Sequence, residues 1–329
     1  MDSQGKKMTV PKRMKSEASA FDERIVERVE HGMVPDLQNT RPCEWFYNNP
    51  WRHPVFVDMV FGEYLRFALR HLPAPPADCL EVGSGPGHMS LELARCGHDV
   101  AGLEISAASI EVATETLHRS PASQTFGSLR YIHSDFLGWH PDQQFDAACF
   151  FLTLHHFEEP RAVLEKIASL LRPRGTIIVI EPARDWFSIR DAAIAALIRI
   201  LLSLEGRWHE QLNPPESTEQ LDQIVHAIHR EYVEARDVGE PPQSPSDNSS
   251  YASAMLEELG LIFDPIAMER GFAFLPRIVG GVRAPSERLT LETAKFLEVF
   301  DAYCVSNGLL EPGAFCYAGQ LRSSVNGGE

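Results

Sequence analysis

The sequence predicts an α/β fold in which helices cover both faces of a mostly parallel sheet. The first observation is an alternation of strand-like and helix-like stretches that begins at Ala77. The second is that the strand-like stretches are continuously apolar, which is typical of strands buried on both faces. The third is a glycine-rich turn directly after the first such run. Strands and helices that alternate in this way imply a doubly wound sheet.

Five apolar runs supply the first five expected strands. They are DCLEV (78–82), DVAGLEI (99–105), LRYIH (129–133), FDAACFFL (145–152) and TIIVIEP (176–182). Two later runs, LIFDPIAM (261–268) and FAFLPRIVGGV (272–282), complete an expected sheet of seven strands. Only a short connection separates these two runs, and a parallel crossover needs a longer one. The last strand should therefore be antiparallel.

Composition outside the strand runs suggests the remaining organisation. We expect a disordered tail over residues 1–16, an N-terminal helical lid over 17–76 and a core over 77–184. A helical cap insertion should follow over 185–250. Residues 251–329 should complete the sheet and add a C-terminal helix at about 287–306.

The charge balance argues against nucleic acid and anionic membranes as partners. The formal net charge is −16 at pH 7, whereas proteins that bind phosphates need a surplus of Lys and Arg. No apolar stretch is long enough for a membrane span, and no signal peptide is apparent. The six cysteines form no CxxC pair, so we expect free thiols and a cytoplasmic protein.

The stretch LEVGSGPGHMS (80–90) carries the strongest functional signal. It places Gly83, Gly85 and Gly87 in a sharp strand-to-helix turn, where backbone without Cβ atoms can lie against a ligand. Glu104 ends the next strand and could accept both hydroxyls of a ribose. A dinucleotide fold shares these features, but its fingerprint G-x-G-x-x-G would need glycine at His88. A nicotinamide or flavin nucleotide and a turn without a ligand stay open as alternatives.

The ordered motifs resemble the class I S-adenosylmethionine-dependent methyltransferases, in particular the small-molecule group with ubiquinone- and menaquinone-pathway enzymes. The resemblance covers residues 77–182 and includes HSDF (133–136) and LLRPRGTIIVIEP (170–182). It implies a Rossmann-like doubly wound seven-stranded methyltransferase sheet with a helical cap insertion. It also implies S-adenosylmethionine as cofactor and a small-molecule substrate.

The resemblance further implies which residues hold the cofactor. The glycines would border its methionine part, Glu81 would order its amino group, and Glu104 would hold the ribose. Asp135 and Phe136 would frame the adenine. The full expected set is Tyr47, Glu81, Gly83, Ser84, Gly85, Gly87, Glu104, Ile105, Asp135, Phe136, Phe151 and Leu152.

His155 and His156, just past the fourth strand, are the candidate catalytic residues. Methyl transfer from a sulfonium needs alignment and sometimes a base, and a histidine there could serve as that base. A purely structural role for the pair is the alternative. At the level of the whole protein, a non-catalytic cofactor-binding protein and a related enzyme that uses the cofactor differently also stay open.

Two regions outside the sheet pattern are the substrate candidates. Residues 44–56 could close over the cofactor or simply pack on the sheet, and Arg52 is the polar candidate there. In the insertion, Trp208 and His209 could contact the acceptor. Glu205 and His209 have i,i+4 spacing, but one such pair is as well explained by a solvated helix end as by a metal, and we predict no metal site. The apolar helix IRDAAIAALIRILLSL (189–204) could instead pair two subunits in a homodimer.

Overall fold

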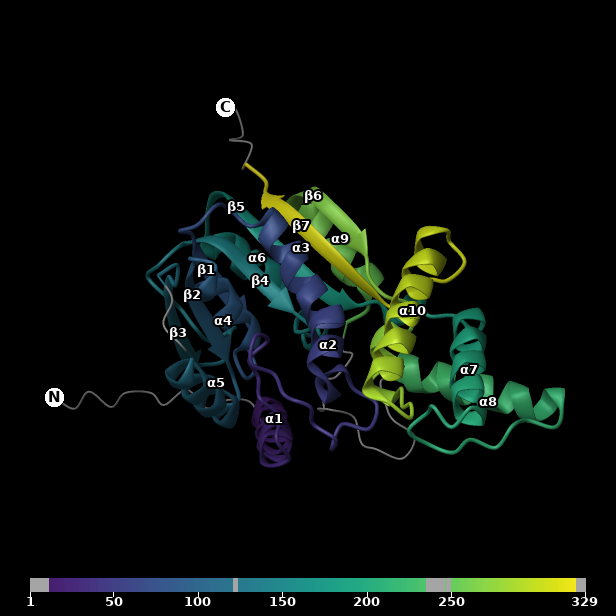
Figure 1. Ribbon diagram of the computed structural model, residues 1–329. Helices are drawn as coiled ribbons and strands as arrows, with labels where there is room; N and C mark the ends of the chain where they lie inside the picture. The colour runs from purple at the N-terminus through teal and green to yellow at the C-terminus, as the bar shows by residue number, and fades with distance from the viewer. Residues whose placement is uncertain (1–11, 121–123, 235–245, 247–249, 324–329) are drawn as a thin grey trace.

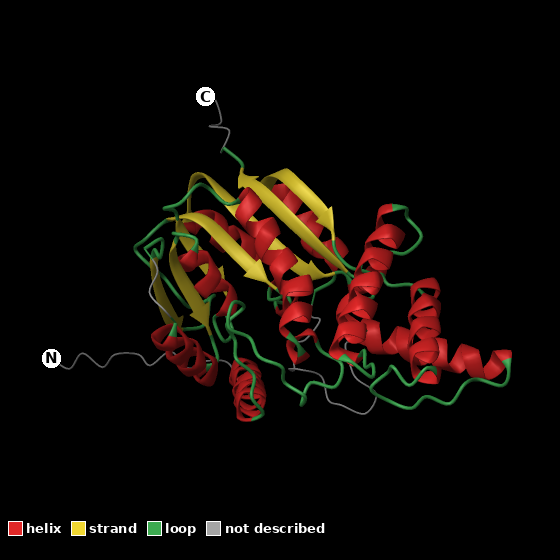
Figure 2. Ribbon diagram, viewed as in Figure 1, coloured by secondary structure: helices red, strands yellow, loops and turns green. Residues whose placement is uncertain are grey.

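A computed structural model describes residues 12–120, 124–234, 246 and 250–323. A sheet of seven strands forms the centre, with helices on both of its faces (Figures 1 and 2). The strands are β1 (Asp78–Val82), β2 (Asp99–Glu104), β3 (Ser128–His133), β4 (Phe145–Phe151), β5 (Leu171–Pro182), β6 (Phe263–Arg270) and β7 (Ala314–Leu321).

The described residues form ten helices. They are α1 (Lys12–Glu30), α2 (Pro54–Val57), α3 (Glu63–His71), α4 (His88–Arg95), α5 (Ala107–Arg119), α6 (Pro160–Leu170), α7 (Ile189–Leu204), α8 (Thr218–Glu234), α9 (Ala252–Ile262) and α10 (Glu287–Ser306). Short 3-10 or π turns are η1 (Pro50–Arg52), η2 (Asp58–Gly62), η3 (Leu154–His156), η4 (Arg184–Trp186), η5 (Leu275–Arg277) and η6 (Val279–Gly281). None of these helices has the length and apolar character needed to cross a membrane.

The strand order is β3-β2-β1-β4-β5-β7-β6. β1 pairs in parallel with β2 and β4, β2 with β3, and β4 with β5. β7 runs antiparallel to both of its neighbours, β5 and β6. The prediction of a mostly parallel seven-stranded sheet with an antiparallel last strand is confirmed.

The prediction that residues 272–282 form the last strand is wrong, because that strand is β7, after α10. Residues 272–282 instead contain η5 and η6. The buried Asp301 of α10 explains this, since its carboxylate accepts hydrogen bonds from the backbone N–H groups of Ala273, Phe274 and Leu275 at 2.7–2.9 Å. These donors are therefore committed to α10 and cannot join a sheet ladder.

The prediction of a disordered tail over residues 1–16 is also wrong in part, because α1 begins at Lys12. Residues 1–11 lie outside the described residues. The helix is docked on the N-terminus of α5 through Asp22, whose Oδ1 accepts from Ser106 Oγ at 2.6 Å and from Ala108 N at 3.0 Å. A carboxylate is favoured at a helix N-terminus, so this contact holds α1 against the sheet edge.

Two apolar layers enclose the sheet. On one face, η2, α3 and α4 pack against the sheet through Val60, Phe67, Met89 and Leu93. On the other, α6 and α9 pack through Leu164, Ile167, Met255 and Leu259. Neighbouring residues of one strand, such as Cys79 and Leu80, belong to opposite layers, as the pleat of a strand requires.

A second core lies outside the sheet, where α7, α8 and α10 group together beyond one end of it (Figure 1). Ala195 of α7, Ile228 of α8 and Leu297 of α10 belong to this cluster. The C-terminal helix therefore packs with the insertion. Most of the Pro/Ser-rich loop at 239–250, which the insertion was expected to contain, lies outside the described residues.

Candidate functional site

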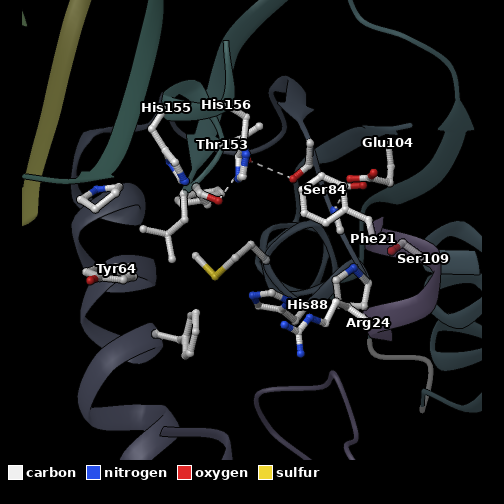
Figure 3. Close-up of a pocket in the computed structure, with 18 of the residues that line it drawn as sticks. Phe21, Arg24, Tyr64, Ser84, His88, Glu104, Ser109, Thr153, His155 and His156 are labelled. Carbon is white, nitrogen blue, oxygen red and sulfur yellow. Dashed lines mark hydrogen bonds between the residues drawn. The ribbon is translucent and has the colours of Figure 1, made fainter. Parts of the chain in front are cut away.

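A cavity of about 1030 Å³ opens at the carboxyl ends of β1, β2, β4 and β5. Open α/β sheets bind ligands at this edge, where the strand order reverses. Helices α1 and α3 close the cavity from the sides, and Figure 3 shows Phe21, Tyr64, Ser84, Glu104 and His155 around it. The predicted site residues that line it are Tyr47, Glu81, Gly83, Ser84, Gly85, Glu104, Ile105, Asp135, Phe136, Phe151, Leu152, His155 and His156.

The three glycines of the turn after β1 have different roles. All have positive φ, between 51° and 81°. A Cβ on Gly83 would overlap the side chain of Thr153, and one on Gly87 would overlap the hydroxyl of Tyr131. A Cβ on Gly85 would meet no protein atom within 4 Å. Gly83 and Gly87 therefore serve packing, and Gly87 does not line the cavity. The bare backbone of Gly85 leaves room for a ligand.

Ser84 adds a polar group to this cradle. Its Oγ is buried and has no hydrogen-bond partner among the described residues. A buried hydroxyl without a partner costs free energy, so a ligand that bonds to it would be stabilised there.

Glu104 presents a prearranged carboxylate beside the turn. Its Oε2 accepts from Gly85 N at 2.8 Å, and its Oε1 accepts from Ile105 N and Ser106 N, both at 2.8 Å. Burial raises the pKa of Glu104, and these three bonds act in the opposite direction. Three of the roughly four lone-pair sites of the carboxylate are filled, so Oε2 can accept one hydroxyl directly, and a second hydroxyl would share Oε1 with its two backbone donors.

We expect Glu104→Ala to weaken cofactor binding by tenfold or more. Charge-assisted hydrogen bonds to two ribose hydroxyls contribute roughly 1.5–3 kcal/mol each at most. Calorimetry with S-adenosylmethionine measures the loss. Adenine, which lacks the ribose, should bind the variant and the unchanged protein alike. Equal weakening of both ligands would indicate that the variant has lost the shape of the cavity.

Asp135 and Phe136 form the cavity wall after β3. The carboxylate of Asp135 accepts from Leu137 N and Gly138 N, both at 3.1 Å, which fixes the turn. Phe136 is buried, and Lys166 Nζ lies 5.1 Å from the centre of its ring. The result is a flat apolar wall with a carboxylate at its edge.

Glu81 lies below the turn and is buried. Its Oε2 accepts a short hydrogen bond from Ser90 Oγ. Burial raises the pKa of Glu81 to about 8, and the charge of Glu104 adds to this shift. Glu81 therefore carries a proton for much of the time at neutral pH.

A buried histidine–carboxylate pair follows β4. His155 Nδ1 lies 2.6 Å from Glu181 Oε2, and Glu181 Oε1 accepts from Thr153 N at 2.7 Å and Leu154 N at 2.6 Å. Burial lowers the pKa of His155, the charge of His156 lowers it further, and Glu181 acts in the opposite direction. His155 is therefore neutral at pH 7, and the bond to Glu181 favours the tautomer with its proton on Nδ1.

His156 connects the same segment to α1. Its Nδ1 lies 3.3 Å from Glu17 Oε1, and its ring meets the ring of Phe21 edge-on at 5.4 Å. Glu17, Phe21, Arg24 and Arg28 fall on one face of α1 and all line the cavity. This helix and residues 45–51 therefore both close the cavity.

Three residues that the sequence offered as substrate contacts do not line the cavity. Arg52 is buried and donates from Nε to Gly280 O at 2.7 Å and from Nη2 to Val282 O at 2.6 Å. His209 donates from its backbone N to Gly281 O at 2.9 Å. Trp208 is buried beside Gly281, with Arg199 5.6 Å above its ring. The expected lid residue Tyr47 does line the cavity but is 68% exposed.

These contacts give Trp208 a packing role, so we expect Trp208→Ala to act on stability. Truncating a buried aromatic side chain typically costs about 3–5 kcal/mol. Urea unfolding should show this loss, while the acceptor KM of the folded variant stays unchanged. An altered KM with unchanged stability would restore Trp208 as a substrate contact.

The Glu205–His209 pair does not share a helix face, because α7 ends at Leu204. Within the described part of the chain, no group of three His, Cys, Asp or Glu residues is arranged to hold a metal ion.

Several residues of the site were not found from the sequence, among them Glu181, which does not line the cavity but holds His155. Glu181 had a detectable signal, since it is an acidic residue at the end of an otherwise apolar strand. Tyr64 of α3 and Phe272 line the cavity, but as aromatic residues in apolar stretches they have no distinguishing pattern. Phe21 and Arg28 were missed because the helical spacing of α1 is interrupted by charged residues.

Comparison with known proteins agrees with this geometry. A ubiquinone biosynthesis O-methyltransferase of Dictyostelium discoideum, named as mitochondrial, is 23% identical over 185 residues, which are 53% of this chain and 58% of that protein. The chain thus spans less than two thirds of that relative. An uncharacterised methyltransferase of Mycobacterium bovis is 30% identical over 192 residues, 55% of this chain and 88% of that protein.

Among solved structures, the cyclase SpnF matches with a TM-score of 0.52 at 14% sequence identity. The match covers 96% of this chain and 98% of the SpnF chain, so the two proteins share a fold. The methyltransferase domain family matches residues 56–234, more than half of the chain. With the ordered motifs and the sheet, this match shows that the chain belongs to the methyltransferase domain family, within the class I S-adenosylmethionine-dependent methyltransferases.

Proposed function

We propose that this protein transfers a methyl group from S-adenosylmethionine to a small-molecule acceptor. The observation that carries the proposal is that the Gly85–Glu104 cradle and His155, whose ring is held by the buried Glu181, line one cavity. The cofactor supplies a methyl group on a sulfonium, which is electrophilic. The residues of this chain have to hold both reactants in line, exclude water, and accept a proton where the acceptor has one to lose.

The cofactor-binding residues follow from the contacts at the carboxyl ends of β1–β4. Glu104 would hold the ribose hydroxyls, and Gly85 would let the backbone lie close to the ligand. Phe136 and Asp135 would take the adenine. The unpartnered Ser84 Oγ and the open space over Gly85 both fit a ligand at this place.

His155 would accept the proton of the acceptor. Because Nδ1 is held at Glu181, the lone pair of the neutral ring is on Nε2. Glu181 would fix the orientation of the ring and stabilise the imidazolium after proton transfer. This arrangement suits a hydroxyl acceptor, whose O–H bond breaks as its oxygen bonds to the methyl carbon. O-methyltransferase is also the activity in the name of the Dictyostelium relative.

The acceptor would enter from the side of the insertion. Phe187, Tyr232 and Phe272 line the cavity there, with Arg277 over the Tyr232 ring at 5.5 Å. These aromatic surfaces favour a largely apolar acceptor. The region 185–250, together with α10, would thus act as a cap that excludes water from the methyl group.

One other candidate is a reaction that uses this site without methyl transfer, although the match to the methyltransferase domain family favours methyl transfer. Product analysis separates the two. With deuteromethyl S-adenosylmethionine and a panel of phenolic and catecholic acceptors, we expect S-adenosylhomocysteine and a labelled product in equal amounts. Cofactor binding with conversion of an acceptor to an unlabelled isomer would favour the other reaction, and binding without any turnover would favour a regulatory protein.

We also propose that the protein works in a reducing compartment such as the cytoplasm, which its six free cysteines support. A homodimer through α7 stays a prediction. Leu197, Leu201 and Leu204 of that helix are 51–55% exposed and would lie in its interface.

A further inference from the structure

The charged residues around the cavity are unevenly distributed along the chain. Every described carboxylate that lines the cavity belongs to residues 17–159. The described lining residues from 182 onwards include Arg184 and Arg277 but no Asp or Glu. The chain as a whole has a formal net charge of −16, so this wall is an exception to its overall charge. A wall with cations and no carboxylate favours an anionic group on the molecule that binds against it.

Arg277 of η5 is held in place by its backbone. Its carbonyl oxygen accepts from Asn48 Nδ2 at 2.7 Å and from Arg199 Nη2 at 3.2 Å. Its guanidinium lies 5.5 Å from the centre of the Tyr232 ring, is only partly exposed, and makes no hydrogen bond or ion pair with any residue that the structure describes. A partly desolvated cation whose one contact of this kind is a ring is stabilised further by an anionic ligand.

Arg199 of α7 provides an internal comparison. Its guanidinium also lies over the Tyr232 ring, at 5.6 Å. However, its Nη1 and Nη2 donate to the two carboxylate oxygens of Glu231 at 2.6 and 2.7 Å, and both side chains are buried. The carboxylate of α8 in this region is therefore paired with Arg199. Within the described residues, a carboxylate for Arg277 would have to come from the ligand.

Two stacked rings lie between Arg277 and the proposed base. Tyr232 stacks on Phe187 with ring centres 4.3 Å apart and an angle of 11° between the planes, and both residues line the cavity. Phe187 follows β5 closely, as does Arg184, whose charge is near enough to lower the pKa of His155. An acceptor whose hydroxyl reaches His155 would thus pass the stacked pair before it reaches Arg277.

We propose that Arg277 binds a carboxylate of the acceptor, so that the acceptor is an elongated hydroxy acid with an aromatic or apolar body. The inference rests on the proposed function. At one end, the hydroxyl loses its proton to His155 as its oxygen bonds to the methyl carbon, and the electron pair of the broken C–S bond stays on sulfur. At the other end, the carboxylate keeps its charge and is not methylated. Arg277 would therefore determine specificity and take no part in the chemical step.

The test compares phenolic acids with their primary amides, which have nearly the same shape and no charge. The KM of para-hydroxycinnamate should be about ten- to a hundredfold below that of its amide, with a similar kcat. Para-hydroxybenzoate should gain much less over its amide, because its carboxylate is attached directly to the ring and is too close to the hydroxyl to reach Arg277.

Substitutions of Arg277 should change this preference in a graded way. Arg277→Gln should lose most of the preference for the acid, and Arg277→Lys should keep part of it. Arg277→Glu should invert it, so that tyramine, a cation, reacts better than para-hydroxyphenylacetate, an anion of similar length. A gain of activity with tyramine cannot result from misfolding. Arg270→Gln is the matched control, because this exposed arginine at the end of β6 lies outside the cavity.

Three results would overturn the carboxylate subsite. They are acids and amides that react alike in the unchanged protein, an Arg277→Gln variant with the full preference for the acids, and a labelled product that is a methyl ester. None of these would affect the proposed function, because methyl transfer would still occur. If S-adenosylmethionine binds but none of the acids or amides is methylated, the proposed function itself is contradicted.

Discussion

Gly85→Leu should abolish cofactor binding while the protein stays folded. An added side chain would extend from the turn into the cavity, because no protein atom lies within 4 Å of the Cβ position. Overpacking costs about 1–3 kcal/mol where neighbours can adapt, and a bound cofactor fixed at Glu104 has little freedom to adapt. The affinity for S-adenosylmethionine, measured by calorimetry, should therefore fall by about a hundredfold or more.

Gly308→Leu provides a matched control. Gly308 has a φ of +65°, against +51° for Gly85, and it also has open space at its Cβ position. Both substitutions force a left-handed residue and should cost about 1–2 kcal/mol of unfolding free energy. Gly308 follows α10 and does not line the cavity, so its variant should bind the cofactor normally. If Gly85→Leu binds as well as Gly308→Leu does, the ligand does not approach the turn.

The central strands could be predicted because buried parallel strands are short apolar runs with turns between them. This pattern located β1 to β5 and the glycine turn, and it also located Glu104, since an acidic residue at a strand end is conspicuous. Glu181 has the same signal at the end of β5, but its partner could not be inferred. The contact with His155 depends on how β4 and β5 pair, which the spacing of residues does not give.

The remaining elements depend on contacts that are distant in sequence. Residues 272–282 are as apolar as a strand, yet Asp301 of α10 takes their backbone donors. The sequence of β7, AFCYAGQL, contains Ala318 and Gly319 side by side. Both residue types are depleted in strands, so this run gives only a weak strand prediction from sequence. Arg52 and Trp208 carry side chains that are typical of binding sites. The partners of Arg52 are the backbone oxygens of Gly280 and Val282, and Trp208 packs against Gly281 and Arg199. Residue type alone does not distinguish such packing from ligand binding.

His155→Ala should lower kcat by about a hundred- to ten-thousandfold for a hydroxyl acceptor, the usual contribution of a general base. Cofactor affinity should change little, because the expected ribose and adenine contacts are at Glu104 and Asp135. His98→Gln is the control, since His98 is also buried but lies outside the cavity. A full-rate His155→Ala variant would mean that the His155–Glu181 pair is structural.

Glu181→Gln tests whether the carboxylate positions this base, and the pH dependence supplies the distinguishing readout. In the unchanged protein kcat/KM should rise with pH and level off above the pKa of His155, which burial holds below its ordinary value. The carboxylate of Glu181 raises that pKa, so its removal should move the rising limb to lower pH. The plateau should also fall, because an amide can turn its oxygen or its NH₂ toward Nδ1 and no longer stabilises the imidazolium. If Glu181 only holds the backbone of Thr153 and Leu154, Glu181→Gln should lower stability and leave the rising limb of the kcat/KM profile at the same pH.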